Sequence, residues 1–116
     1  MAKPAQRAGS VSPGRKRLSL SRAQRVAILK ALADPRRFEL LERIASAGCP
    51  VGCSEALAAL PISAATLSHH VKELETAGLI EVRRKGKFAY LMLRPGVLDS
   101  LASYLAALES GSCSAH

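Results

Sequence analysis

Apolar residues recur every three or four positions through much of the chain after residue 20, a pattern typical of amphipathic helices. Two helices are predicted first. Ser21 is placed to cap one of about ten residues, and Asp34 is placed to cap another over residues 35–46, where Pro35 fits the first turn. We expect the second helix to bury an apolar face made of Phe38, Leu41, Ile44 and Ala45.

Two further helices are predicted in the middle of the chain. A short helix over residues 55–60, capped by Ser54, precedes a longer helix over residues 63–77, capped by Ser63. The apolar stripe of the longer helix consists of Leu67, Val71 and Leu74. Gly78 follows it, at the position where a left-handed C-terminal cap requires glycine.

After Gly78 the period of the pattern changes to two, which is typical of strands. Residues 79–83 and 87–93 are predicted to form a hairpin around Gly86, and a last helix follows and ends before Gly111. The predicted fold is therefore mainly α with a β-hairpin wing, a winged helix-turn-helix of about five helices and one two-stranded hairpin. Its domain spans residues 21–110, between a flexible basic arm over residues 1–20 and a disordered tail over residues 111–116.

Charge is concentrated at the start of the chain. The formal net charge is +8; residues 1–30 carry eight basic and no acidic side chains, while the remainder carries nine of each. A basic segment attached to a neutral domain favours a polyanionic partner, either nucleic acid or an anionic membrane surface. A merely solubilising tail is the alternative.

The chain shows neither a membrane span nor a secretory signal. No apolar run approaches the ~20 residues that a spanning helix needs, and no apolar stretch follows the basic N-terminus. The three cysteines are an odd number, which favours reduced thiols over a disulfide framework. These features predict a cytoplasmic protein without a membrane partner.

The predicted helix over residues 63–77 is the candidate for entering a DNA groove. The face opposite its apolar stripe is small and polar at its start and basic further on, and its candidate DNA contacts are Ser63, Ala65, Thr66, Ser68, His69 and Lys72. His70 lies nearer the apolar stripe, so it is expected to be a half-buried packing residue or a phosphate contact. The alternative is an ordinary amphipathic surface helix, in which Ser63 and Thr66 serve only as capping residues.

The predicted hairpin supplies independent support for DNA binding. Its tip carries four candidate phosphate or minor-groove contacts: Arg83, Arg84, Lys85 and Lys87. Because like charges repel, such a cluster is unfavourable unless a polyanion is near, although a solvated tip is the alternative. Phe88 and Tyr90 alternate on one strand face and are expected to pin the hairpin to the domain.

Four motifs together resemble the ArsR-type family of winged-helix repressors, the metal- and thiol-responsive regulators of bacteria. The motifs are Leu32-Ala33-Asp34-Pro35-Arg36-Arg37, the segment over residues 63–71, Glu75-Thr76-Ala77-Gly78-Leu79-Ile80, and the segment over residues 86–93. The resemblance covers roughly residues 22–109. It implies a homodimer built on the first and last helices, which represses transcription by binding a palindromic operator in double-stranded DNA, often upstream of its own operon, until an inducer binds.

The expected dimer interface combines Val26 and Leu29 on the first helix with an apolar stripe on the last helix. That stripe consists of Val97, Leu101, Tyr104, Leu105 and Leu108. It is larger than one small domain needs to cover, so a dimer interface is a natural use of it. The alternative is that the stripe packs only on its own domain.

The resemblance also directs attention to candidate sensor sites. Cys49 and Cys53 lie just ahead of the predicted third helix, near where the family has a Cys-Val-Cys arrangement, but their spacing differs from it. They could bind a soft metal or metalloid such as arsenite, with Cys113 or His116 as a third ligand, or respond to a thiol-reactive signal. Alternatively the cysteines have no sensing role. No cofactor is required, and no zinc site is expected on the last helix, which has Asp99 but no histidine.

Three other classes of function predict different features. An enzyme is not expected, because the chain contains no nucleophile–base set, phosphate loop or metal-hydrolase spacing. A non-specific nucleic-acid-binding module would obtain most of its affinity from the basic arm and hairpin. A winged helix used only for protein–protein contact would not depend on the hairpin cations.

Overall fold

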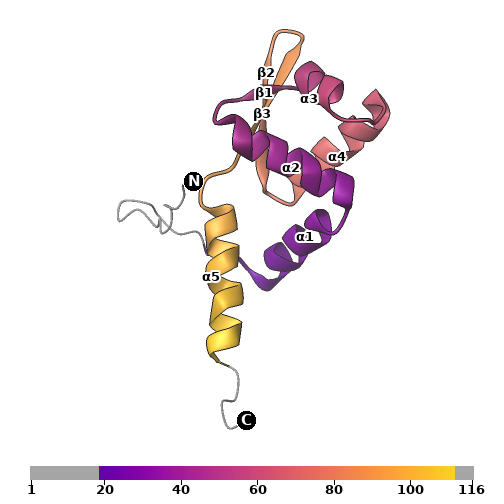
Figure 1. Cartoon of the computed structure of the whole chain (residues 1–116). Helices are drawn as coiled ribbons and strands as arrows, with labels where there is room; N and C mark the ends of the chain where they lie inside the picture. Colours follow the sequence, from indigo (N-terminus) through magenta and orange to yellow (C-terminus); the bar gives the residue numbers. More distant parts are fainter. Residues whose placement is uncertain (1–18, 112–116) are drawn as a thin grey trace.

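The computed structural model describes residues 19–111, which form five helices and a small sheet (Figure 1). The elements are α1 (Arg22–Leu32), α2 (Pro35–Ala47), β1 (Val51–Gly52), α3 (Cys53–Ala59), α4 (Ala64–Thr76), β2 (Ile80–Lys85), β3 (Phe88–Leu93) and α5 (Val97–Ser110). None of these helices is long and apolar enough to cross a membrane. The predicted arm, except residues 19 and 20, and the predicted tail beyond Gly111 lie outside the described residues.

Three of the four predicted helix caps are confirmed. Backbone amides donate to the Ser21 hydroxyl, the Asp34 carboxylate and the Ser63 hydroxyl at the starts of α1, α2 and α4. The prediction for α3 was wrong by two residues, because Gly52 is the N-cap and Ser54 lies inside the helix. The Gly52 amide donates to the Glu55 carboxylate at 3.3 Å, so a side chain of α3 itself caps the first turn of the helix.

The sheet has three antiparallel strands in the order β1-β3-β2, one more than predicted. The extra strand, β1, is only two residues long, and pairs Val51 with Leu91 and Gly52 with Tyr90. A segment this short carries no alternating pattern that sequence analysis could detect. The turn between β2 and β3 contains Gly86 at φ 62°, and Gly78 has the predicted left-handed conformation after α4, at φ 83°.

The register of the hairpin gives its two faces different chemistry. One face carries Ile80, Val82 and Arg84 on β2, opposite Leu93, Leu91 and Ala89 on β3. The other face carries Glu81, Arg83 and Lys85, opposite Met92, Tyr90 and Phe88. Ile80 and Leu91 are buried, so the first of these faces is turned toward the helices, and we call it the inner face.

The core lies between the helices and this inner face. Its largest fully buried side chains are Ile28, Leu40, Leu74, Leu79 and Leu91. The predicted buried face of α2 was partly wrong, because Phe38 is 42% exposed and Ala45 is also exposed. The inward positions are 37, 40, 41 and 44, and Arg37 at the first of them masked the apolar stripe in the sequence.

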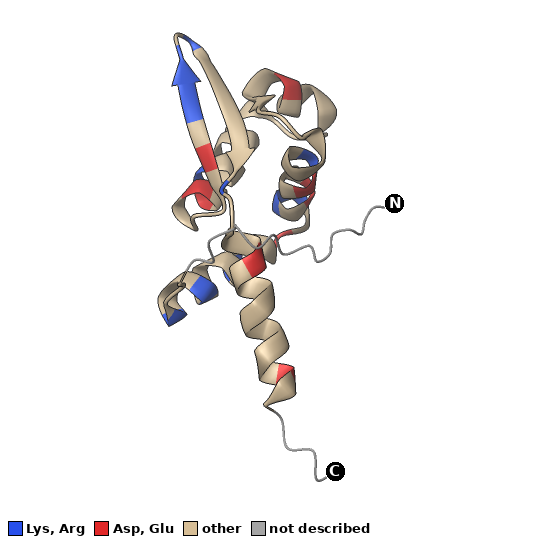
Figure 2. Ribbon diagram, turned by 90° about the vertical axis from the view of Figure 1, so that its left-hand side faces the viewer, with Lys and Arg blue, Asp and Glu red and all other residues tan. Residues whose placement is uncertain are grey.

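Helix α5 extends away from the rest of the domain (Figures 1 and 2). Its beginning is buried against the domain, where Val97 is 2% and Leu101 is 5% exposed. The expectation that these two residues form the dimer interface was therefore wrong, because they already belong to the core of one protomer. Further along, the Arg25 guanidinium carbon lies 3.7 Å from the centroid of the Tyr104 ring, which joins α1 to α5.

Candidate nucleic-acid interface

The outward face of α4 is exposed as predicted. Its exposed side chains include all six primary candidates: Ser63, Ala65, Thr66, Ser68, His69 and Lys72. The opposite face anchors the helix, with Leu67 5% and Leu74 0% exposed. The Ser63 hydroxyl donates to the Thr66 hydroxyl at 2.9 Å and accepts from its amide, so these two residues shape the start of the helix. Ser68, His69 and Lys72 are thus the polar side chains with most freedom to contact a base or phosphate.

His70 is the exception among the candidates on α4. It is 6% exposed, so it is a packing residue, as one of the two expectations had it, although it is buried rather than half-buried. The other expectation, a phosphate contact, was wrong, and His70 is withdrawn from the DNA contacts. Its Nδ1 atom is buried without a hydrogen-bond partner, as is Nε of Arg37 on α2. Burial lowers the pKa of His70, and the guanidinium of Arg37 and the neighbouring His69 add to that effect, whereas the carboxylate of Asp34 opposes it.

The neutral form of His70 should make stability depend on pH. A histidine whose pKa is lower in the folded than in the unfolded protein stabilises the fold above its unfolded pKa, ordinarily 6.5, and that contribution is lost as pH falls below it. The free energy of unfolding, measured with urea, should therefore decrease between about pH 7.5 and about pH 5.5. His70→Gln should flatten this decrease, whereas His69→Gln, at an exposed position, should retain it. Equal pH dependence in wild type and His70→Gln would contradict the assignment.

The hairpin forms the predicted basic wing. Figure 2 shows Lys and Arg along β2 up to the tip, and all four cations are exposed: Arg83, Arg84, Lys85 and Lys87. Within the described residues, the one ion pair that these cations form joins Arg83 to the carboxylate of Glu81 at 3.8 Å. Phe88 is 56% exposed, so it does not pin the hairpin to the domain as expected, although Tyr90 is partly buried. The reason is that Phe88 lies at the tip, which projects beyond the helices (Figure 1).

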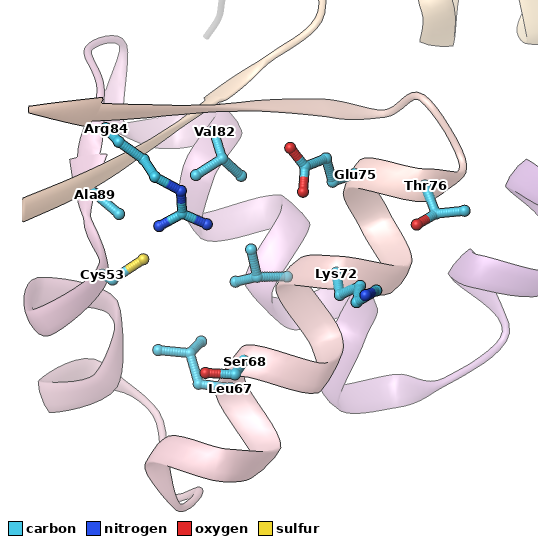
Figure 3. A pocket seen from close by; sticks show the side chains of 10 residues that line it. Cys53, Leu67, Ser68, Lys72, Glu75, Thr76, Val82, Arg84 and Ala89 are labelled. Atoms are coloured by element: carbon cyan, nitrogen blue, oxygen red, sulfur yellow. The ribbon is translucent and has the colours of Figure 1, made fainter.

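A cleft that the sequence did not reveal lies between α4 and the inner face of the wing (Figure 3). Its volume is about 380 Å³, and its lining includes Ser68 and Lys72 from α4, Arg84 from β2 and Cys53 from α3. The alternation of side chains along β2 places Arg83 and Arg84 on opposite faces of the strand, and this much could be predicted from the sequence. Which of the two faces is turned toward the helices is decided only by the packing of the domain.

The two candidate sensor cysteines within the described residues have different surroundings. Cys49 is exposed and Cys53 is partly buried, and both are free thiols. Burial raises the pKa of the Cys53 thiol, and the nearby cationic Arg84 offsets part of that effect. Cys113 and His116 lie outside the described residues, and within residues 19–111 no three His, Cys, Asp or Glu side chains are grouped to hold a metal ion.

An exposed apolar surface remains on α1 and α5. Four of the predicted interface residues have large exposed fractions, namely Val26 at 37%, Leu29 at 45%, Leu105 at 41% and Leu108 at 55%. Tyr104 is partly buried beside Arg25. A helix that projects from a domain with leucines exposed along it is typical of an element that packs on a partner.

The arrangement of α3, α4 and the sheet defines a winged helix-turn-helix protein. A family model described as "Helix-turn-helix domain" matches residues 25–83. The arsenical resistance operon repressor of Staphylococcus aureus is 35% identical over 67% of this chain and 73% of its own length. The chain belongs to the ArsR-type family of winged helix-turn-helix transcriptional regulators.

Other relatives show the same resemblance over different shares of their length. The arsenic resistance transcriptional regulator ArsR1 of Pseudomonas putida is 37% identical over 60% of this chain and 54% of its own. The chain thus spans about half the length of this relative and of a putative arsenical resistance operon repressor of Halobacterium salinarum, where it covers 53%.

Solved structures show the same fold. A crystal structure of an ArsR family transcriptional regulator has a TM-score of 0.70 at 22% identity, covering 80% of this chain and 94% of that one. A homodimeric winged helix-turn-helix DNA-binding domain from Mycobacterium bovis has a TM-score of 0.59 at 24% identity, covering 76% and 78%.

Proposed function

We propose that this chain is a sequence-specific DNA-binding repressor that acts as a homodimer on a palindromic operator. The observation that carries the proposal is the exposed face of α4, small and polar at its first turns and basic at Lys72, beside a wing with four cations. Helices of this kind place their first turns in the major groove, and wing cations bind the backbone or the minor groove.

The proposed dimer is supported by the exposed apolar residues of α1 and α5. The homodimeric state of the Mycobacterium bovis domain supports it by analogy. Two protomers related by a twofold axis would present two copies of α4 to two half-sites, which is why the operator is expected to be palindromic.

The test is a titration of the reduced protein against the DNA upstream of its own operon and against a scrambled duplex, at several salt concentrations. Binding to one operator roughly 10³-fold tighter or better than to the scrambled duplex is the expected result. Equal, steeply salt-dependent binding to both would favour a non-specific nucleic-acid-binding module. Retention of function after neutralising the wing and Lys72 would favour a protein–protein contact domain.

Ser68 and His69 are the proposed determinants of operator preference. Their joint replacement by Ala should reduce the ratio of operator to scrambled affinity roughly tenfold or more, because a side chain that reads a base supplies about 1–3 kcal/mol of discrimination. The affinity for the scrambled duplex should change much less. Ser46→Ala, at an exposed position on α2, is the matched control. An unchanged affinity ratio in the double variant would show that the base-reading face was assigned wrongly.

An inducer at the cysteines is a second proposal, supported by two free thiols at the two ends of the short segment around β1. Arsenite is the probe, because it binds thiolates. Release of the operator by arsenite in wild type but not in Cys49→Ser would support a cysteine-based inducer site. Equal release from both proteins would exclude Cys49 from it.

A further inference from the structure

The face of the wing opposite to the inner face, which we call the outer face, carries a groove. Its volume is about 580 Å³, which is within the usual range of small-molecule sites. Arg84 is the one residue that lines both this groove and the cleft beside α4. The lining residues come from the two strands of the wing and from the segment before β1: Pro50, Arg83, Arg84, Lys85, Tyr90 and Met92.

The floor of the groove is apolar and aromatic. Tyr90 and Met92 are partly buried on β3. Tyr90 pairs with Gly52 on β1, and a Cβ atom placed on Gly52 would lie 3.9 Å from Cε1 of the Tyr90 ring. Because Gly52 has no side chain, nothing from that residue covers the ring, and a flat ligand can pack on it. Pro50 and Met92 also border a smaller hollow of about 250 Å³, so the apolar surface continues toward the end of α2.

The charge of the groove comes from β2. Side chains alternate along this strand, so Arg83 and Lys85 both lie on the outer face. Arg83 forms an ion pair with Glu81 at 3.8 Å, but both of these side chains are exposed. Exposed ion pairs contribute little, because solvent screens them. An anionic ligand can therefore replace Glu81 as the partner of Arg83.

We propose that the outer face of the wing is a binding site for a small organic anion with a flat apolar body, an aromatic carboxylate, whose binding opposes that of DNA. The carboxylate is bound by Arg83 and Lys85, and the apolar body packs on Tyr90 and Met92. A guanidinium matches a carboxylate because it can donate two parallel hydrogen bonds to it. A lone inorganic anion leaves the apolar floor uncovered, and a neutral aromatic molecule leaves the cations without a partner.

The regulatory part of this proposal rests on the proposed function. Arg83 and Lys85 are two of the four wing cations assigned to DNA. A carboxylate bound between them neutralises charge that otherwise binds a phosphate, so the affinity for DNA falls. The ligand thus acts as an inducer at a site formed without any cysteine ligand.

Met92 gives a direct readout of the groove, because the chain has only one other methionine, Met1. Protein isotopically labelled at its methionine methyl groups is titrated with cinnamate and observed by nuclear magnetic resonance. We expect a saturable shift of the Met92 methyl signal, since the ring current of a bound phenyl group acts on it, and no shift of Met1. Met92→Leu assigns the two signals.

Two further probes separate charge from apolar contact. Sulfate carries charge without an apolar body, and cinnamamide has the apolar body without the charge. Each should bind at least roughly tenfold more weakly than cinnamate, because each lacks one of the two kinds of contact. Binding of either probe as tight as that of cinnamate would overturn the proposal.

Opposite charge changes at neighbouring positions of β2 should have opposite effects. Arg83→Gln should weaken cinnamate binding roughly tenfold, as expected for the loss of a charge-assisted hydrogen bond. Glu81→Gln should strengthen it, because Arg83 loses its competing partner. Arg43→Gln, which removes an exposed cation from α2, is the matched control and should leave the affinity for cinnamate unchanged. Equal affinities in the wild type and Arg83→Gln would contradict the assignment, as would weaker binding to Glu81→Gln.

The effect on DNA is measured separately. Saturating cinnamate should weaken operator binding about tenfold or more, compared with sodium chloride at the same ionic strength. If cinnamate shifts the Met92 signal but the wild type binds no duplex, the DNA-binding function fails and the ligand site stands. If the protein binds its operator and cinnamate leaves Met92 unchanged, only the ligand site fails. A Met92 shift with unchanged operator affinity would overturn the regulatory part.

Discussion

Replacing Leu105 and Leu108 together by Glu is expected to convert the protein to monomers and to remove tight operator binding. The two leucines are 41% and 55% exposed on a helix that projects from the domain. Buried in a dimer, each would contribute about 1.5–3 kcal/mol, whereas two buried carboxylates without partners would oppose association. The variant should run as a monomer in analytical ultracentrifugation at concentrations where the wild type is dimeric.

Dissociation of the proposed dimer should affect DNA binding more than any single substitution at the interface with DNA. A dimer binds its second half-site as an intramolecular step, with an effective concentration in the millimolar range, so a monomer should bind the operator roughly 10²-fold more weakly or worse. The variant Ala106→Glu/Ala107→Glu adds the same two charges on roughly the opposite side of α5 and should remain dimeric. A dimeric Leu105→Glu/Leu108→Glu variant would show that the interface lies elsewhere.

Replacing Arg83, Arg84 and Lys85 together by Gln is expected to weaken binding to every duplex by a similar factor. These side chains lie on a wing where they can neutralise phosphates without contacting bases. The affinity for operator and for scrambled DNA should fall roughly 10²-fold at low salt, and the slope of log affinity against log salt should decrease by about 0.9 for each phosphate that is no longer neutralised.

The control for the wing variant is Arg43→Gln, which removes an exposed cation from α2. Its salt dependence should stay close to that of the wild type. A wing variant that binds the operator more weakly but keeps its affinity for scrambled DNA would contradict the assignment, because it would mean that the wing contacts bases.

Helix starts and turns are determined by local chemistry, and the sequence was sufficient for most of them. Ser21, Asp34 and Ser63 cap their helices because each side chain reaches amides two or three residues ahead, whatever the rest of the fold does. Gly78 and Gly86 take up the left-handed conformations expected of glycine at a helix end and a hairpin turn. The exposed face of α4 could also be predicted from the sequence, because the apolar stripe of the helix is buried and the opposite side is left exposed.

Contacts between different helices and strands could not be predicted from the periodicity of the sequence. The two-residue strand β1 exists only because β3 offers it a partner. Arg37 takes an inward position on α2 that the pattern assigned to Phe38, since its guanidinium donates to the Ala31 carbonyl at 3.2 Å. Val97 and Leu101 lie in the core, whereas Leu105 and Leu108 on the same stripe do not, because α5 leaves the domain partway along its length.

The same distinction, between features set within one element and features set by contacts between elements, applies to the candidate site. The sequence by itself determined the fold class, the helix that presents polar residues outward and the basic character of the hairpin, because these depend on side-chain spacing within one element. The tertiary structure alone decided that His70 is buried, that Phe88 is exposed and that Arg84 rather than Arg83 lines a cleft with Lys72. Burial and orientation depend on which neighbours approach each side chain, and those neighbours come from distant parts of the chain.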